Sequence, residues 1–167
     1  MKKLLLPVLL SSVLLAACES TTVAPGSDTS GIPTVIVDAP VNPDTGYKEL
    51  DDPSSILYKR SVYFDFDRYD INPQYRPLVE AHASFLSKHP ELSIQIAGNT
   101  DERGSREYNL ALGQKRAEAV RRALVLLGAR DSQIEAVSLG EEKPACTAAT
   151  EECYAQNRRG DLQYPAK

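Results

Sequence analysis

Apolar and polar residues alternate at four places between residues 61 and 164, a period of two that is typical of β-strands. The predicted strands cover residues 61–66, 92–98, 134–139 and 160–164. Between the strands, two segments repeat apolar residues every three or four positions, the spacing of one helix face. These two helices, and a shorter third, are predicted at residues 73–89, 106–127 and 151–157. Strands that alternate with helices predict an α/β (α+β) sandwich, with helices packed on one face of a single sheet.

Local signals mark the ends of the two longer helices. Asn72 and Pro73 suit the N-cap and the first helical position, because Asn accepts a free backbone N–H and proline lacks one. Pro90 stops this helix, and Gly128 suits the position after the second one. We therefore expect well-defined boundaries for both helices.

The first seventeen residues have the features of an export signal. Lys2 and Lys3 precede an apolar run over residues 4–15, and small residues follow. The run is shorter than the ~20 apolar residues that span a bilayer. Residues 15–18 (Leu-Ala-Ala-Cys) resemble the lipobox of bacterial lipoproteins, which implies that cleavage falls before Cys18 and that Cys18 is acylated. Glu19, in place of an aspartate that would signal inner-membrane retention, favours the outer membrane. An ordinary secreted protein with a chance cysteine is the alternative.

Residues 18–55 are predicted to comprise the lipidated cysteine and a flexible linker. Ser, Thr, Pro, Gly, Val and Asp dominate the segment, which cannot bury enough apolar surface to offset its ordering entropy. An apolar island at residues 34–37 fits a brief strand or a docking point. A coil of roughly 37 residues has a dimension of about 35 Å and a stretched limit of about 120 Å. A spacer without a length requirement is equally consistent. Residues 56–167 then form one domain of ordinary size.

Charge and cysteine usage fit an exported protein. Removal of residues 1–17 leaves 17 basic against 23 acidic side chains, a net charge of −6, which argues against nucleic-acid binding. Cys146 and Cys153 are expected to form a disulfide that pins the chain locally. A zinc site would need further ligands, and His82 and His89 lie far away in the sequence. The Cys-x-x-Cys spacing of a catalytic redox site is missing.

A polar loop at residues 98–104 carries the strongest candidate for ligand recognition. It ends one predicted strand and opens a predicted helix, with Asp101 in the loop and Arg116 fifteen residues later. A planar guanidinium suits a carboxylate and Asp101 offers acceptors to an ammonium, so the pair could hold a zwitterion such as an amino acid. Asn109, Leu112 and Arg116 share one helix face. The alternative is a capped helix start beside a solvated arginine.

Two further groups of charged residues give less specific signals. Three carboxylates within residues 65–70 could suggest paired acids for glycoside hydrolysis or a calcium loop. The Gly and Glu of an EF-hand are missing, however, and a domain of this size has little room for a long cleft. A polar strand-to-helix loop that can line a ligand site is the better interpretation. Arg158 and Arg159 are either solvated or hold an anionic ligand or the acidic loop at residues 141–142.

Six ordered motifs resemble the family of OmpA-like peptidoglycan-binding domains. They cover residues 62–71, 98–104, 108–113, 116–117, 140–144 and 157–159. The resemblance implies the order β-α-β-α-β-(α)-β, with helices packed on one mixed sheet. It also implies non-covalent binding of diaminopimelate in the peptide stems of the cell wall, without cleavage. Asp101 and Arg116 match the pair that grips the zwitterionic end of that residue. The same resemblance assigns the rest of the site to Phe64, Asp67, Thr100, Leu112 and Arg159.

The resemblance also implies protein partners. Family members with the sequence Asn-Thr-Asp-Glu-Arg-Gly bind the periplasmic protein TolB, within the Tol system for envelope integrity and cell division. Two departures from the family pattern stand out. Gly160 and Asp161 weaken the last strand or make it an edge strand, and the pair Cys146 and Cys153 is not universal. Neither departure touches the binding motif.

The function predicted from the sequence is a non-enzymatic tether without cofactor or metal. An outer-membrane lipoprotein would hold peptidoglycan through its periplasmic domain and work with TolB. One alternative is an OmpA-family lipoprotein that anchors a secretion or motor complex without TolB. A more remote one is a peptidoglycan hydrolase that uses Asp65, Asp67 or Glu102 as acid and base.

Overall fold

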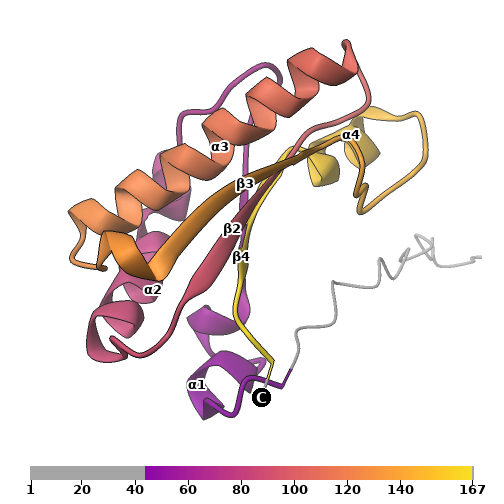
Figure 1. The fold of residues 1–167 in the computed structure, drawn as a ribbon. Helices are drawn as coiled ribbons and strands as arrows, with labels where there is room; N and C mark the ends of the chain where they lie inside the picture. Colours follow the sequence, from indigo (N-terminus) through magenta and orange to yellow (C-terminus); the bar gives the residue numbers. More distant parts are fainter. Residues whose placement is uncertain (1–43, 167) are drawn as a thin grey trace, which may run out of the picture. The chain divides into compact units, whose positions relative to one another are not determined.

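The computed structural model describes residues 44–166, which include a four-stranded sheet (Figure 1). Its strands are β1 (Ser61–Tyr63), β2 (Ile94–Asn99), β3 (Ile134–Gly140) and β4 (Arg159–Gln163), in the spatial order β1-β4-β2-β3. β4 is antiparallel to β1 and β2, whereas β2 and β3 are parallel. The sheet is therefore mixed, and the predicted fold class is confirmed. The predicted signal peptide, Cys18 and the island at residues 34–37 lie outside the described residues.

Two long helices, α2 (Arg76–Lys88) and α3 (Arg106–Leu126), lie on the same side of the sheet in Figure 1. The Ser105 hydroxyl accepts the N–H of Tyr108 at the start of α3, and Gly128 follows its end in a left-handed conformation (φ 108°). The shorter elements are α1 (Lys48–Asp51), α4 (Glu151–Asn157) and the 3₁₀ turns η1 (Ile56–Tyr58), η2 (Pro73–Tyr75) and η3 (Asp131–Gln133). Within residues 44–166, no helix combines the length and the apolar character needed to cross a membrane.

The hydrophobic core lies between these helices and the sheet. Five side chains from four elements are each at most 3% exposed: Ile94, Ile96, Leu162, Leu86 and Val120. β2 and α3 meet most closely where both carry glycine, because a Cβ on Gly98 would overlap the carbonyl oxygen of Gly113. This contact brings the end of β2 against the middle of α3, the region that holds the candidate site.

β4 lies inside the sheet, so the expectation of an edge strand is wrong. The side chains of Val120 and Phe64 pack against Gly160, because a Cβ at this position would lie 3.3 Å from Val120 and 3.5 Å from Phe64. Asp161 is satisfied by hydrogen bonds from Ser61, Asn99 and Arg159. An acidic residue can therefore occupy a central strand here, because other segments of the fold supply its donors.

Packed structure begins before residue 56, the expected start of the domain. Leu50 in α1 is fully buried in the core. The Thr45 hydroxyl donates to the Asp51 carboxylate at 3.0 Å, and Arg60 donates to the Leu50 carbonyl oxygen at 2.8 Å. A single apolar residue in a four-residue helix produces no periodic pattern, so α1 could not be identified from hydrophobic spacing.

The buried His82 predicts a dependence of stability on pH. Its Nε2 donates to the Lys59 carbonyl oxygen and its Nδ1 accepts from the Tyr164 hydroxyl, both at 2.9 Å. Burial lowers the pKa of His82 from 6.5 to about 4. Between about pH 6.5 and pH 4, His82 is therefore protonated in the unfolded chain but neutral in the folded chain. The free energy of unfolding is expected to fall by about 3 kcal/mol as the pH decreases from about 6.5 to 4.

Urea unfolding between pH 4 and pH 8 measures this dependence. We expect His82→Gln to show a flatter profile than the wild type from pH 6.5 down to pH 5, above the range in which most carboxylates titrate. Identical profiles for the two proteins would contradict the role given to His82.

Candidate ligand-binding site

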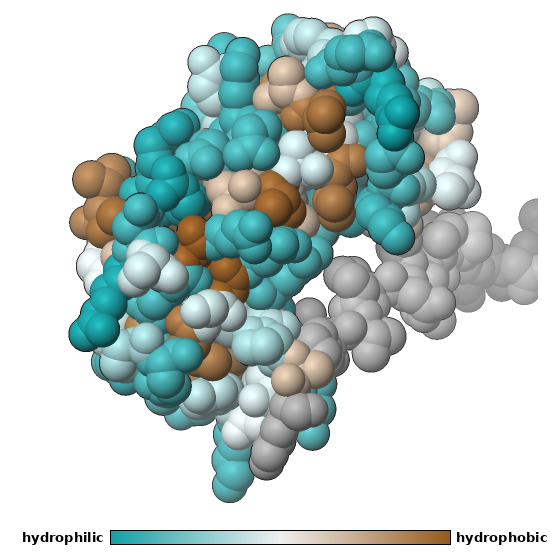
Figure 2. Space-filling model, in the orientation of Figure 1, coloured by the Kyte–Doolittle hydropathy of each residue, from teal (hydrophilic) through white to brown (hydrophobic). Residues whose placement is uncertain are grey.

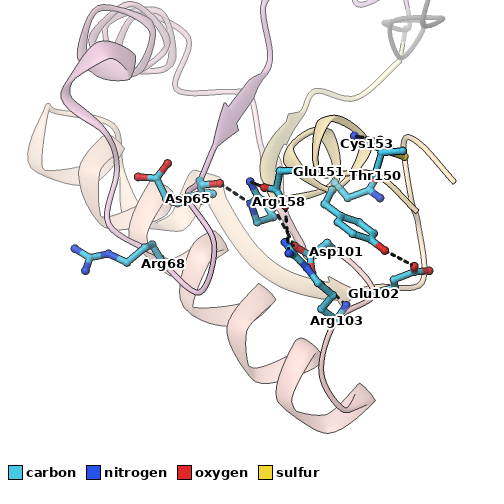
Figure 3. A network of polar contacts seen from close by, with 12 residues as sticks. Asp65, Arg68, Asp101, Glu102, Arg103, Thr150, Glu151, Cys153 and Arg158 are labelled. Atoms are coloured by element: carbon cyan, nitrogen blue, oxygen red, sulfur yellow. Dashed lines mark hydrogen bonds and ion pairs between the residues drawn. The ribbon is translucent and has the colours of Figure 1, made fainter. Parts of the chain in front are cut away.

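Asp101 lies in the loop between β2 and α3, and its side chain is almost fully buried. Arg103 donates to its carboxylate through the backbone N–H at 3.1 Å, Nε at 3.2 Å and Nη2 at 2.7 Å. Arg158 donates through Nη1 at 3.2 Å (Figure 3). Burial acts to raise the pKa of Asp101, but the hydrogen bonds from Arg103 and Arg158 outweigh it and hold this pKa below its ordinary value. The loop therefore presents a buried, ionised carboxylate.

Arg116 reaches the same region from the middle of α3 and has no exposed surface. Its guanidinium donates to the carbonyl oxygens of Arg68 at 2.9 Å, Asn99 at 2.9 Å and Asp65 at 3.2 Å. It also lies over the Phe64 ring, 5.3 Å from the ring centre. Three of the five N–H groups of the guanidinium are used in this way, which leaves two for a ligand. Among residues 44–166, no carboxylate oxygen lies within 4.0 Å of it.

Within residues 44–166, Arg116 is a buried cation with no carboxylate in direct contact. Burial lowers its pKa from 12.5 to about 10, against a raising effect of the Asp101 charge. The group remains protonated at neutral pH. An unpaired buried charge is strongly unfavourable unless a partner compensates it. An anion supplied by a ligand would provide that partner.

A cavity of about 260 Å³ lies between the Asp101 loop and α3. Its lining residues are Phe66, Asp67, Thr100, Asp101, Arg103, Gly104, Tyr108, Asn109, Leu112, Arg116 and Arg158. The volume suits the end of one amino-acid side chain, because whole drug-sized ligands fill about 300–1,000 Å³. The Thr100 hydroxyl is buried and has no hydrogen-bond partner within the described part of the chain. It is a further polar group that a ligand could satisfy.

The rim of the cavity is aromatic. Phe66 is 58% exposed and Tyr108 is 49% exposed. The Tyr108 hydroxyl donates to the carboxylate of Asp67, which has a left-handed backbone conformation (φ 56°) that is uncommon outside glycine. The Arg103 guanidinium lies 4.3 Å from the centre of the Phe66 ring and 4.5 Å from that of Tyr154. These contacts hold Arg103 at the mouth of the cavity.

The structure brings most of the predicted site residues together. Five line the cavity: Asp67, Thr100, Asp101, Leu112 and Arg116. Phe64 lies in the core beneath the Arg116 guanidinium. Arg159 lies elsewhere, where its Nε donates to Asp161 at 2.9 Å and its Nη2 to the Lys143 carbonyl oxygen at 3.3 Å. Its neighbour Arg158 reaches the site instead.

Six lining residues were not among the predicted site residues: Phe66, Arg103, Gly104, Tyr108, Asn109 and Arg158. All six stand inside the motifs that carry the family resemblance, so their positions were visible in the sequence. The Arg158 side chain could not be placed from strand periodicity, because Arg158 lies between α4 and β4, outside both elements.

The three acid–base candidates do not converge. Asp67 lines the cavity, whereas Asp65 is exposed and Glu102 accepts a hydrogen bond from the Tyr154 hydroxyl at 3.0 Å outside it. The predicted disulfide between Cys146 and Cys153 is confirmed. Residues 44–166 contain no group of three or more His, Cys, Asp or Glu side chains that could hold a metal ion.

Comparison with known proteins gives one family. A sequence model described as the OmpA family matches residues 63–158. The peptidoglycan-associated lipoprotein of Legionella pneumophila is 39% identical over 168 residues, which cover 93% of this chain and 91% of the relative. That of Pasteurella multocida is 48% identical over 104 residues, 62% of this chain and 69% of the relative.

Comparison with solved structures finds the same kind of protein. The crystal structure of the peptidoglycan-associated lipoprotein from Burkholderia pseudomallei is 62% identical, with a TM-score of 0.69. The match covers 70% of this chain and 99% of that one. The C-terminal domain of Helicobacter pylori MotB shares the fold at 20% identity and a TM-score of 0.58, covering 65% of this chain and 86% of that one.

Proposed function

The chain belongs to the OmpA family, and on this basis we propose that it is an outer-membrane lipoprotein that binds peptidoglycan without cleaving it. The names of its relatives support this function, since they are peptidoglycan-associated lipoproteins. The observation that carries the proposal is Arg116, a buried cation beside a small cavity with no counter-ion among the described residues.

The ligand is the side-chain end of diaminopimelate, which carries an amine and a carboxylate on one carbon. The carboxylate pairs with the two remaining N–H groups of Arg116, and the ammonium approaches Asp101. Each oxygen of Asp101 already accepts two hydrogen bonds. The ammonium therefore competes with Arg103, which is 36% exposed and more easily displaced than Arg158 at 8%.

The expected affinity of one domain is modest. Hydrogen bonds to charged groups each contribute ~1.5–3 kcal/mol, which places the dissociation constant between the micromolar and millimolar range once ordering costs are met. Many lipid-anchored copies facing one cell wall would make the attachment firm by avidity. Acylation of Cys18 and a linker between Cys18 and the packed residues that begin near Thr45 would supply that anchorage and reach, with the domain in the periplasm.

We place this protein in the Tol-Pal system, with TolB as its protein partner. The identity to several peptidoglycan-associated lipoproteins supports this role. In-cell cross-linking through a photoreactive residue at position 110 on the exposed face of α3 tests it. Recovery of TolB is expected. Recovery of secretion or motor components without TolB would favour the alternative in which the domain anchors such a complex.

Co-sedimentation with purified sacculi tests peptidoglycan binding. Asp101→Ala and Arg116→Ala are each expected to lower the bound fraction to background, because each removes one half of the zwitterion site. Arg76→Ala and Glu80→Ala are matched controls, since both side chains are exposed on α2 outside this cavity. They should bind like the wild type.

The same experiment separates binding from hydrolysis. The supernatant of the wild-type incubation should contain no released muropeptides above the sacculus blank. Full retention of both site variants on sacculi, with folded protein shown by circular dichroism, would refute the site. Release of muropeptides that disappears in Asp67→Asn would instead establish an enzyme.

A further inference from the structure

The helix α4 contacts the loop of the candidate site, although it is only seven residues long. Its first residue, Glu151, lies near Arg103 (Figure 3) and pairs with it at 3.2 Å. The Tyr154 hydroxyl donates to Glu102 at 3.0 Å. The Tyr154 ring also lies against the Arg103 guanidinium, 4.5 Å away. One face of α4 therefore holds the loop that carries Asp101.

The residue after α4 makes the most direct contact. Arg158 donates to Asp101 at 3.2 Å and to the Phe64 carbonyl oxygen at 3.1 Å. It also pairs with Glu151 at 2.8 Å. The position of Arg158, and with it the charge around Asp101, therefore follows the position of α4.

α4 itself is held by a clamp outside the hydrophobic core. The buried residues of the helix are Cys153 and Asn157, and neither belongs to the core cluster. Cys153 is bonded to Cys146, and the Asn157 side chain accepts the N–H groups of Ala145 and Cys146 and donates to the Cys146 carbonyl oxygen, at 2.8 to 3.0 Å. A helix this short is not stable alone in water. Both attachments run through Cys146 or its neighbour, so the disulfide is the covalent part of the clamp.

We propose that the Cys146–Cys153 disulfide positions α4 for ligand binding, so that its reduction weakens the grip on peptidoglycan while the fold persists. This inference rests on the proposed function. The fold is expected to survive because the disulfide closes a short loop, with a sequence separation of 7, and neither cysteine belongs to the hydrophobic core cluster. Reduction would release Arg158 and Tyr154 from their places beside Asp101 and Arg103.

The chemistry of the switch is thiol–disulfide exchange with a dithiol. Cys153 is 2% exposed and Cys146 is half-buried, so a dithiol thiolate attacks the Cys146 sulfur. The S–S bond breaks, Cys153 leaves as a thiolate and takes up a proton. The second thiol of the reagent then displaces Cys146, which is protonated in turn. The protein gains two electrons and two protons, and the dithiol becomes a cyclic disulfide.

Binding of the detergent-purified full chain to a soluble stem tripeptide that ends in meso-diaminopimelate tests the proposal. The dissociation constant is measured by titration calorimetry with and without dithiothreitol, and thiols are counted by alkylation and mass spectrometry. Reduction is expected to weaken binding about tenfold, within the usual range of coupling between sites. The double variant Cys146→Ser with Cys153→Ser should match the reduced protein and show no response to dithiothreitol.

Arg158→Gln distinguishes positioning from general loosening of the fold. If the disulfide acts through Arg158, reduction should change the affinity of this variant much less than that of the wild type. Equal affinity of the oxidised and reduced wild type, with the free thiols verified, would overturn the proposal. Absence of binding in both states would refute the proposed function. Amide hydrogen exchange of residues 99–104 would then decide the positioning role, since exchange that is unchanged on reduction would overturn that role as well.

Discussion

A stem peptide that carries lysine in place of meso-diaminopimelate is expected to bind at least about 30-fold more weakly, the effect of removing one partner of a buried charge pair. Lysine keeps an ammonium at the end of its side chain but lacks the carboxylate. Arg116 has no exposed surface and no carboxylate within 4.0 Å among the described residues. With the lysine peptide, its charge stays buried and unpaired.

A double-mutant cycle makes this prediction specific to one contact. In Arg116→Gln, both peptides should bind with similarly low affinity, because the group that distinguishes them is gone. Arg76→Gln, which changes an exposed arginine on α2, should keep the full preference. Titration calorimetry with the four combinations of peptide and protein measures the coupling. A wild type that binds both peptides equally would show that Arg116 does not read the carboxylate.

The sequence contained most of the information needed to place Asp101 and Arg116 together. The apolar pattern locates β2 and α3, and the loop between them places Asp101 directly after β2. The close approach at Gly98 and Gly113 then brings the helix against the strand. The apolar patterns of β2 and α3 are local features of the sequence. They predict the elements correctly because the same apolar residues face the hydrophobic core in the folded chain.

What the sequence did not contain is the identity of long-range partners. Asp161 looked unsuitable for a central strand, but its donors come from Ser61, Asn99 and Arg159. Ser61 and Asn99 lie 100 and 62 residues away in the sequence. The contact of Arg158, in place of Arg159, with the site has the same origin, because Arg158 lies just outside β4 and its partner Asp101 is 57 residues away in the sequence.

The hydrogen bonds from Arg103 and Arg158 to Asp101 could not be predicted from the sequence either. Arg103 follows Asp101 by two residues, and such a pair is ordinarily solvated and contributes little. Here Asp101 is 4% exposed while the Arg103 side chain is 36% exposed, so the carboxylate is buried and a ligand ammonium must displace Arg103 or share the carboxylate with it. Burial is a property of the folded chain, and the motif alone does not predict it.

Gly98→Ala is expected to lower the free energy of unfolding by about 3 kcal/mol, at the upper end of what one overpacked methyl group produces. Its Cβ would overlap the Gly113 carbonyl oxygen and lie 3.1 Å from the Ala117 backbone nitrogen. Both atoms belong to the backbone of α3, so no side-chain rotation relieves the clash. β2 and α3 must separate, which would also move Asp101 away from Arg116.

Gly160→Ala is the matched control for this substitution. Its Cβ would meet only the side chains of Val120 and Phe64, at 3.3 and 3.5 Å, and side chains can shift by a few tenths of an ångström. The smaller conformational freedom of alanine in the unfolded chain offsets part of that cost, by about 0.4–1 kcal/mol. Urea unfolding at pH 7 should therefore show a large loss for Gly98→Ala and a small change for Gly160→Ala. Equal losses would mean that any side chain added to the sheet is destabilising, and that the contact between β2 and α3 has no special part in holding the two halves of the site together.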